Sequence, residues 1–185
     1  MKIAFCDLET TGLSREKHEI IEVAGVIWDN TEDLIVDTFH EYIKPNVRIP
    51  PIITQITGIT NNTVMNARKS WDVLPEFYSW LKVHGVKIIA GHNFKSFDSK
   101  FLEAQVNRYK LNERYAIDLS TYEIMDTLTI ARALNKAGKI KTIDCKQPTL
   151  AAYFNIQYVA HSAIEDVKAL VGVYRAMRKL DSKLI

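Results

Sequence analysis

Cysteine, glycine and proline are scarce in this sequence, which has two, seven and five of them in 185 residues. With Cys6 and Cys145 as its only cysteines, the chain does not fit the pattern of a disulfide-stabilised scaffold, and a reducing compartment is expected. No low-complexity stretch, repeat or glycine- and proline-rich linker divides the sequence. We therefore predict one domain over residues 1–185.

Long apolar runs are also missing. No run approaches the length of a membrane-spanning helix, and the acidic residues Asp7 and Glu9 come within the first ten positions, unlike a signal peptide. The sequence therefore predicts a cytoplasmic protein with no membrane partner.

An excess of charge of one sign is absent as well. Lysine and arginine number 24 against 22 aspartate and glutamate residues, a formal net charge of +2. So small an excess argues against a protein that coats duplex DNA through its overall charge. It leaves open an enzyme that holds a single strand end locally.

Apolar patterning predicts strands that first form a meander and then alternate with helices. A short polar turn joins the second and third strands, which should therefore be antiparallel. We predict strands over 2–8, 20–28, 34–43 and 86–90, a fifth leading into Asp126, and helices over 70–84, 97–109, 127–134, 149–154 and 162–180. This order indicates an α/β fold, a mixed sheet with helices on both faces.

Asp7 and Glu9 lie two residues apart at the end of the first predicted strand. Alternate residues of a strand point to the same side, so these carboxylates should lie together. Two adjacent carboxylates repel each other unless a proton or a cation lies between them, and oxygen ligands favour Mg²⁺ or Mn²⁺. The alternative is that both are solvated charges at a strand end.

Two further segments carry acids at element boundaries. Asp98 falls in the first turn of a predicted helix, where it could also serve only to cap that helix. His161 precedes the last helix and Asp166 lies one turn inside it; alone, His161 could be an ordinary polar loop residue. Together, Asp7, Glu9, Asp98 and Asp166 fit a two-metal site for phosphodiester hydrolysis, with His161 taking the proton of the attacking water.

These segments resemble a known family. D-x-E-T-T-G-L at 7–13, H-N…F-D at 92–98 and H-x-A-x-x-D at 161–166 are similar to the three motifs of the DEDDh, or DnaQ-like, 3′–5′ exonucleases. Segments 56–60, 126–128 and 149–151 extend the resemblance over nearly the whole chain. The three residues between Asn93 and Phe97 match the spacing of TREX-type members, whereas proofreading subunits usually have two, so the branch is left open.

The resemblance implies a ribonuclease H-like fold with a five-stranded mixed sheet. It implies two divalent cations, Mg²⁺ or Mn²⁺, on Asp7, Glu9, Asp98 and Asp166, with His161 as general base. In the same way the Thr10 and Thr11 backbone would hold the 3′-terminal nucleotide, and Leu13 would wedge against its base. Leu13 could equally be a core residue, and Asn93 either contacts substrate or only braces its loop.

Residues 132–146 contain five basic residues and a single acidic residue, Asp144. We interpret this stretch as a mobile basic loop, in which Lys139 and Lys141 contact substrate phosphates, or else as a solvated charged surface. Glu22, within an apolar strand, is assigned to the solvated face rather than to the surroundings of the metal site. His18, His40 and His84 have no acidic partners at ligand spacing and receive no role.

The sequence thus predicts a metal-dependent exonuclease that releases nucleoside 5′-monophosphates from single-stranded or frayed DNA 3′ ends. An RNA 3′-trimming enzyme of the same family is the close alternative. A catalytically silent module that binds nucleic acid or a DNA polymerase is the alternative from another class.

Overall fold

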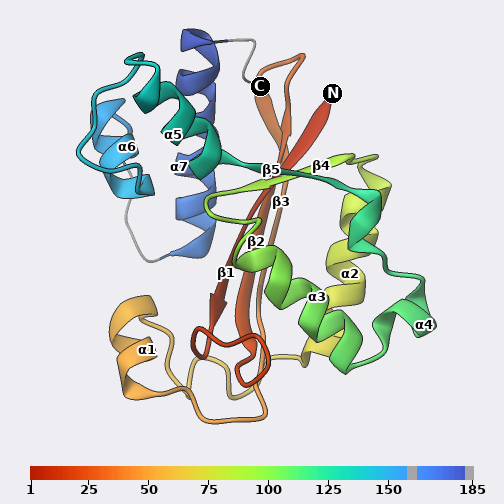
Figure 1. The fold of residues 1–185 in the computed structure, drawn as a ribbon. Coiled ribbons are helices and arrows are strands. Elements are labelled where there is room, and N and C mark those ends of the chain that lie inside the picture. Colours follow the sequence, from red (N-terminus) through yellow and green to blue (C-terminus); the bar gives the residue numbers. More distant parts are fainter. Residues whose placement is uncertain (158–161, 182–185) are drawn as a thin grey trace.

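A computed structural model describes residues 1–157 and 162–181. Its centre is one five-stranded sheet with strand order β3-β2-β1-β4-β5 (Figure 1). The strands are β1 (Lys2–Thr10), β2 (Ile20–Asp29), β3 (Leu34–Tyr42), β4 (Ile88–Gly91) and β5 (Glu123–Asp126). The β1–β2 and β2–β3 pairs are antiparallel, and β1–β4 and β4–β5 are parallel. The predicted mixed sheet is confirmed.

The helices are α1 (Pro51–Thr57), α2 (Ser70–Val83), α3 (Asp98–Arg108), α4 (Leu111–Tyr115), α5 (Thr127–Lys136), α6 (Gln147–Tyr153) and α7 (Ala163–Leu180), with a 3₁₀ turn at Leu119–Thr121. The prediction missed α4, because five residues are too few to show a helical period. None of the described helices is long and apolar enough to cross a membrane.

The alternation of β1 divides the interior into two cores, one on each face of the sheet. Ile3 and Phe5 pack under α5, α6 and α7, whereas Ala4, Cys6 and Leu8 pack under α2 and α3. Figure 1 shows these two groups of helices on opposite sides of the strands. Helices therefore cover both faces, as predicted.

The sheet opens toward the end of β1. The last β1–β4 pair is Phe5 with Ala90, and β4 ends at Gly91 while β1 continues to Thr10. Gly91 allows the chain to turn away here, because a Cβ on it would lie 2.5 Å from the Phe94 ring. The second half of β1 thus borders a loop, residues 92–97, instead of a strand.

Candidate active site

Asp7 and Glu9 lie on the face of β1 that carries Ile3 and Phe5, as the alternation of the strand requires. Both line a cleft of about 810 Å³ and keep part of their surface exposed. In the β1–β2 register, Asp7 is opposite Ala24 and Glu9 is opposite Glu22. The two predicted ligands therefore point to one side, as expected.

Asp98 reaches the same region from the other face of the sheet. It is the first residue of α3, is only 4% exposed, and its Oδ1 accepts the Leu8 N–H at 3.1 Å. The N-cap of α3 is Phe97, and no side chain caps the helix. Asp98 therefore stands in the first turn of α3, as predicted, but its carboxylate also accepts a hydrogen bond from β1 and so does more than stabilise the helix end.

Asp166 lies in the first turn of α7 and lines the cleft with Asp7 and Glu9. Its backbone carbonyl accepts a hydrogen bond from Gln147 Nε2 at 2.8 Å, which ties α7 to α6. The predicted general base, His161, lies outside the described residues.

Burial and mutual repulsion raise the pKa of these carboxyl groups. Burial raises the pKa of Asp7 well above its usual value, and the charges of Asp98, Glu9 and Asp166 raise it further. Burial, with Glu22 and Asp166, raises the pKa of Glu9 to about 7. Burial also raises the pKa of Asp98 to about 8, although the hydrogen bond from Leu8 opposes that rise. The four acids are thus close enough to act on one another.

This donor set fits a hard divalent cation. Across residues 1–157 and 162–181, no three His, Cys, Asp or Glu side chains are already arranged around a metal position. The carboxylates of the cleft nevertheless supply only oxygen ligands, which Mg²⁺ and Mn²⁺ prefer. Burial raises the pKa of the neighbouring Cys6 thiol, which keeps it protonated and unsuited to bind metal.

Glu22 and His40 form a hydrogen-bonded pair beside this site, which the sequence did not predict. Glu22 is only 3% exposed, and its Oε1 lies 2.6 Å from His40 Nε2. The hydrogen bond with Glu22 raises the pKa of His40. Assigning Glu22 to the solvated face was wrong, and its place in an almost wholly apolar strand was the available signal.

Asp126 is a second residue whose role was missed. At the end of β5, its carboxylate accepts the backbone N–H groups of Asn93, Lys95 and Leu128 at 3.1, 3.1 and 3.0 Å. Asn93 adopts a left-handed conformation with φ of 66° and lines the cleft. Asp126 therefore fixes the loop that leads into Asp98.

The turn after β1 is closed by hydrogen bonds of its own. Thr10 Oγ1 donates to the Gly12 carbonyl at 2.8 Å, the Thr11 N–H donates to the Glu19 carbonyl at 2.8 Å, and Thr11 Oγ1 accepts the Glu19 N–H at 3.0 Å. A Cβ on Gly12 would lie 2.6 Å from the His18 ring, so a side chain there would displace His18. Leu13 is 84% exposed, which excludes its interpretation as a core residue.

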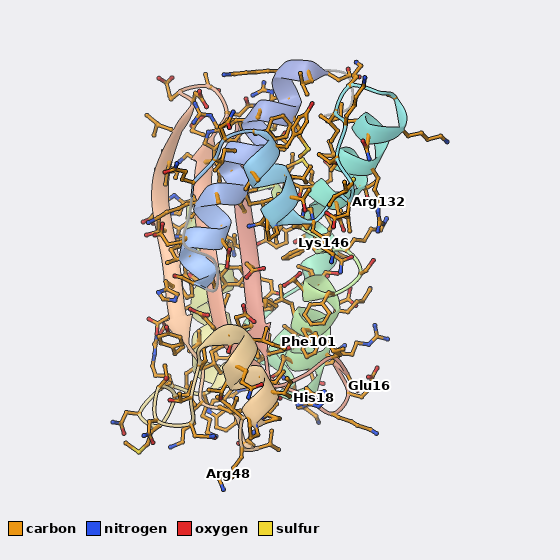
Figure 2. All side chains as sticks on the ribbon, turned by 90° about the vertical axis from the view of Figure 1, so that its left-hand side faces the viewer. Glu16, His18, Arg48, Phe101, Arg132 and Lys146 are labelled. Atoms are coloured by element: carbon orange, nitrogen blue, oxygen red, sulfur yellow. The ribbon has the colours of Figure 1, made fainter. Side chains whose placement is uncertain are left out.

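Arg108, in the last turn of α3, holds the following segment. Its Nη2 donates to the Arg15 and Glu16 carbonyls at 3.1 and 2.9 Å, and its Nη1 donates to the His18 carbonyl at 3.4 Å. Figure 2 shows Glu16 and His18 below Phe101, in the lower part of the molecule and above Arg48. The helix that begins with Asp98 therefore ends by fixing the loop after Leu13.

The basic segment is arranged differently from the prediction. Arg132 and Lys136 belong to α5, so this part is helical and not a loop. Lys139 is paired with Asp181 at 2.5 Å. Neither Lys139 nor Lys141 lines the cleft, which instead contains Arg132 and Lys146.

A comparison with known families agrees with this geometry. A family model described as "Exonuclease" (RNase_T) matches residues 4–174. The chain belongs to this exonuclease family. The resemblance to DnaQ-like exonucleases and the ribonuclease H-like fold are thereby confirmed.

Known relatives are much longer than this exonuclease-family chain. It is 34% identical over 172 residues to a PolC-type DNA polymerase III of Caldanaerobacter subterraneus subsp. tengcongensis, covering 92% of this chain and 11% of the relative. The structure of exonuclease I from Methylocaldum szegediense superposes with a TM-score of 0.86 at 22% identity, over 99% of this chain and 41% of that one. A zinc-bound complex of Escherichia coli exonuclease I with single-stranded DNA gives 0.85 at 20% identity, over 99% and 42%.

Proposed function

We propose that the chain is a metal-dependent 3′–5′ exonuclease that acts on single-stranded or frayed DNA ends and releases nucleoside 5′-monophosphates. The observation that carries this proposal is the convergence of Asp7, Glu9, Asp98 and Asp166, whose charges act on one another beside an open cleft. Membership of the exonuclease family supports the reaction class.

In this proposal the four carboxylates hold two divalent cations, Mg²⁺ or Mn²⁺. Such cations stabilise charge on the attacking and leaving oxygens of a phosphodiester. The chain itself contributes the rigid placement of the ligands: Asp98 is fixed to β1 through Leu8, and Asp166 is fixed to α6 through Gln147. This preorganisation lowers the cost of assembling the site during the reaction.

The remaining catalytic and substrate contacts follow from the motifs. His161 accepts the proton of the attacking water. The turn at Thr10, Thr11 and Leu13 receives the 3′-terminal nucleotide, and the exposure of Leu13 supports contact with the terminal base. Asn93 lines the cleft, which supports contact with the sugar-phosphate backbone.

DNA is the proposed substrate because the relatives are DNA polymerases and the structural neighbours include a complex with single-stranded DNA. RNA 3′ ends remain the alternative within the family. We further propose that the chain works with a DNA polymerase, since the matching part is only 11% or 9% of the length of the PolC-type relatives. Its two free cysteines agree with a cytoplasmic location.

The decisive experiment is digestion of 5′-labelled DNA and RNA strands of the same sequence, with Mn²⁺ and with chelator. We expect a ladder of 5′-labelled products shortened from the 3′ end, only with metal, and faster for DNA. Asp7→Asn should abolish the ladder, whereas Asp37→Asn, a matched change on the edge strand β3, should leave it intact. Metal-independent digestion, or full activity of Asp7→Asn, contradicts the proposal.

A further inference from the structure

The cleft has a cationic wall as well as an acidic one. Arg132, on α5, and Lys146, the residue before α6, line the same cleft as Asp7, Glu9 and Asp166. Neither cation forms a salt bridge with any residue of 1–157 or 162–181. Figure 2 shows both on one side of the molecule, above Phe101 and the loop of Glu16 and His18.

Packing fixes this wall relative to the acids. Ile130, Ala131 and Leu134 bury one side of α5 in the core, which leaves Arg132 on the exposed side. The Lys146 N–H donates to Asp144 Oδ1 at 3.0 Å. Next in the chain, Gln147 donates to the carbonyl of Asp166. The segment carrying Lys146 is therefore tied to the helix that carries a predicted metal ligand.

The chemistry of the wall indicates its ligand. Asp144 also lines the cleft, so Arg132, Lys146 and Asp144 together carry one net positive charge, in addition to the carboxylates of Asp7, Glu9 and Asp166. Apolar surface of Leu128 and Pro148 belongs to the same cleft. Cations bind phosphates, and apolar surface suits the sugar and base of a nucleotide.

The direction of the strand follows from the two sides of the loop at 92–97. Leu13, proposed to meet the terminal base, lines a separate hollow with Ser96 and Phe97. The cationic wall lies in the cleft that holds His92 and Asn93. The carboxylates Asp7, Glu9 and Asp166 share the cleft with the wall and not the hollow of Leu13. With the scissile phosphate at these carboxylates and the terminal base at Leu13, the wall is left for the 5′ part of the strand.

We infer that Arg132 and Lys146 form a binding site for the phosphodiesters immediately 5′ of the scissile bond. This inference rests on the proposed function, because the carboxylates must hold the scissile phosphate. It transfers the phosphate contact predicted for Lys139 and Lys141 to two cations that line the cleft.

The test is equilibrium binding of a labelled oligothymidylate in Ca²⁺, which replaces the catalytic cation so that the strand is not cut. Removing one cation that binds a phosphate should reduce the slope of log affinity against log salt by about 0.7, so Arg132→Ala with Lys146→Ala should reduce it by about 1.4. Lys136→Ala is the matched control, because it removes a charge from the same helix outside the cleft. Lys136→Ala should leave the salt slope unchanged. Arg132→Lys keeps the positive charge, so it should retain most of the wild-type salt slope.

Neutral methylphosphonate groups, placed at one internucleotide position at a time, locate the contact. The wild-type protein should lose affinity most when the position next to the scissile phosphate on its 5′ side is neutral, and the double variant should not respond there. An unchanged salt slope in the double variant, or a larger decrease with Lys139→Ala and Lys141→Ala, overturns the inference.

A failure of the inferred phosphate site can be distinguished from a failure of the proposed function, because binding is measured without hydrolysis. A protein that binds as described but never cuts in Mg²⁺ or Mn²⁺ contradicts the proposed function. A protein that cuts, but whose double variant keeps the wild-type salt slope, contradicts only the phosphate site.

Discussion

Asp126 and Asn93 are joined across 33 residues of sequence by a hydrogen bond from the Asn93 N–H to Asp126 Oδ1 at 3.1 Å. Asp126→Ala removes the acceptor of that N–H and of two others. We expect the free energy of unfolding to fall by about 2 kcal/mol, the usual cost of leaving such groups unsatisfied. We expect kcat to fall at least tenfold, because Asp98 follows this loop and small displacements in an active site are costly. Urea unfolding and steady-state kinetics measure the two effects.

Asp118→Ala is the matched control for Asp126→Ala. Asp118 also accepts a backbone N–H two residues ahead, that of Ser120 at 2.9 Å, but it lies outside the cleft. It should lose stability without losing kcat. Equal losses of kcat in both variants would show that Asp126 acts only through overall stability.

The raised pKa values of Asp98 and Glu9, about 8 and about 7, predict how the metal-free protein responds to pH. Between the unfolded value near 4 and these folded values, the folded chain holds protons that the unfolded chain has released. Stability should therefore fall as pH rises from about 5 to about 8. Urea unfolding in chelator tests this, and Asp98→Asn should flatten the decline.

Cation binding should reverse that trend, because metal ligands must be deprotonated. Added Mn²⁺ should raise Tm more at about pH 8 than at about pH 6. Asp37→Asn is the control, since hydrogen bonds from Trp80 and Thr38 lower the pKa of Asp37. The stability that Asp37 contributes is present above its unfolded pKa and is lost as pH falls. Its pH dependence is therefore opposite to that of Asp98 and Glu9. A metal-free protein that gains stability up to pH 8 would contradict the assignment.

Arg108→Ala should impair substrate binding more than chemistry. The change frees three backbone carbonyls of the loop after Leu13. We expect a severalfold higher KM with a smaller change in kcat. Arg108→Lys should rescue little, because a single ammonium group does not replace a planar fork of donors. Arg68→Ala, which breaks surface ion pairs with Glu41 and Glu76, should leave KM unchanged.

Leu13→Ala should separate substrate contact from folding. Leu13 is 84% exposed, so its truncation should change the free energy of unfolding by less than about 0.5 kcal/mol. Digestion of frayed duplex ends should slow more than digestion of single strands. Val83→Ala, at a site 80% exposed on α2, is the control and should affect neither. Identical digestion rates for Leu13→Ala and the wild-type protein would contradict the proposed contact of Leu13 with the terminal base.

His161→Ala should lower kcat by about 10²–10⁴, the usual contribution of a general base. Substrate affinity should change much less. His84→Ala removes a side chain that is hydrogen-bonded to Asp37 and does not line the cleft, so it should lower stability without lowering kcat. Single-turnover kinetics measure the chemical step directly. An unchanged rate would mean that another group accepts the proton of the attacking water.

Local pattern was enough to predict most of the fold and the shared strand face of Asp7 and Glu9. The apolar run at the start of the chain predicted β1, and the two-residue spacing of Asp7 and Glu9 predicted that they share a face. Helical periodicity predicted α3 and α7. The antiparallel meander followed from the short turn between β2 and β3.

Roles set by distant partners could not be predicted in this way. Glu22 meets His40 across a strand pair, and Arg108 binds carbonyls about 90 residues earlier in the chain. Lys139 looked like a substrate contact because its partner, Asp181, is 42 residues away. Composition records the charges of such residues but not their partners.

The bond between Leu8 and Asp98 crosses the boundary between strand and helix, and the four acids rest on both sides of the sheet. The positions of Asp7 and Glu9 depend on how α7 packs on one face of the sheet. The position of Asp98 depends on how α3 packs on the other face. Weakening the packing of the core on either face of the sheet should therefore change the distances between the carboxylates before the strands separate. Heating should accordingly abolish the proposed nuclease activity at a lower temperature than that at which the sheet unfolds, and bound cations should reduce the difference between the two temperatures.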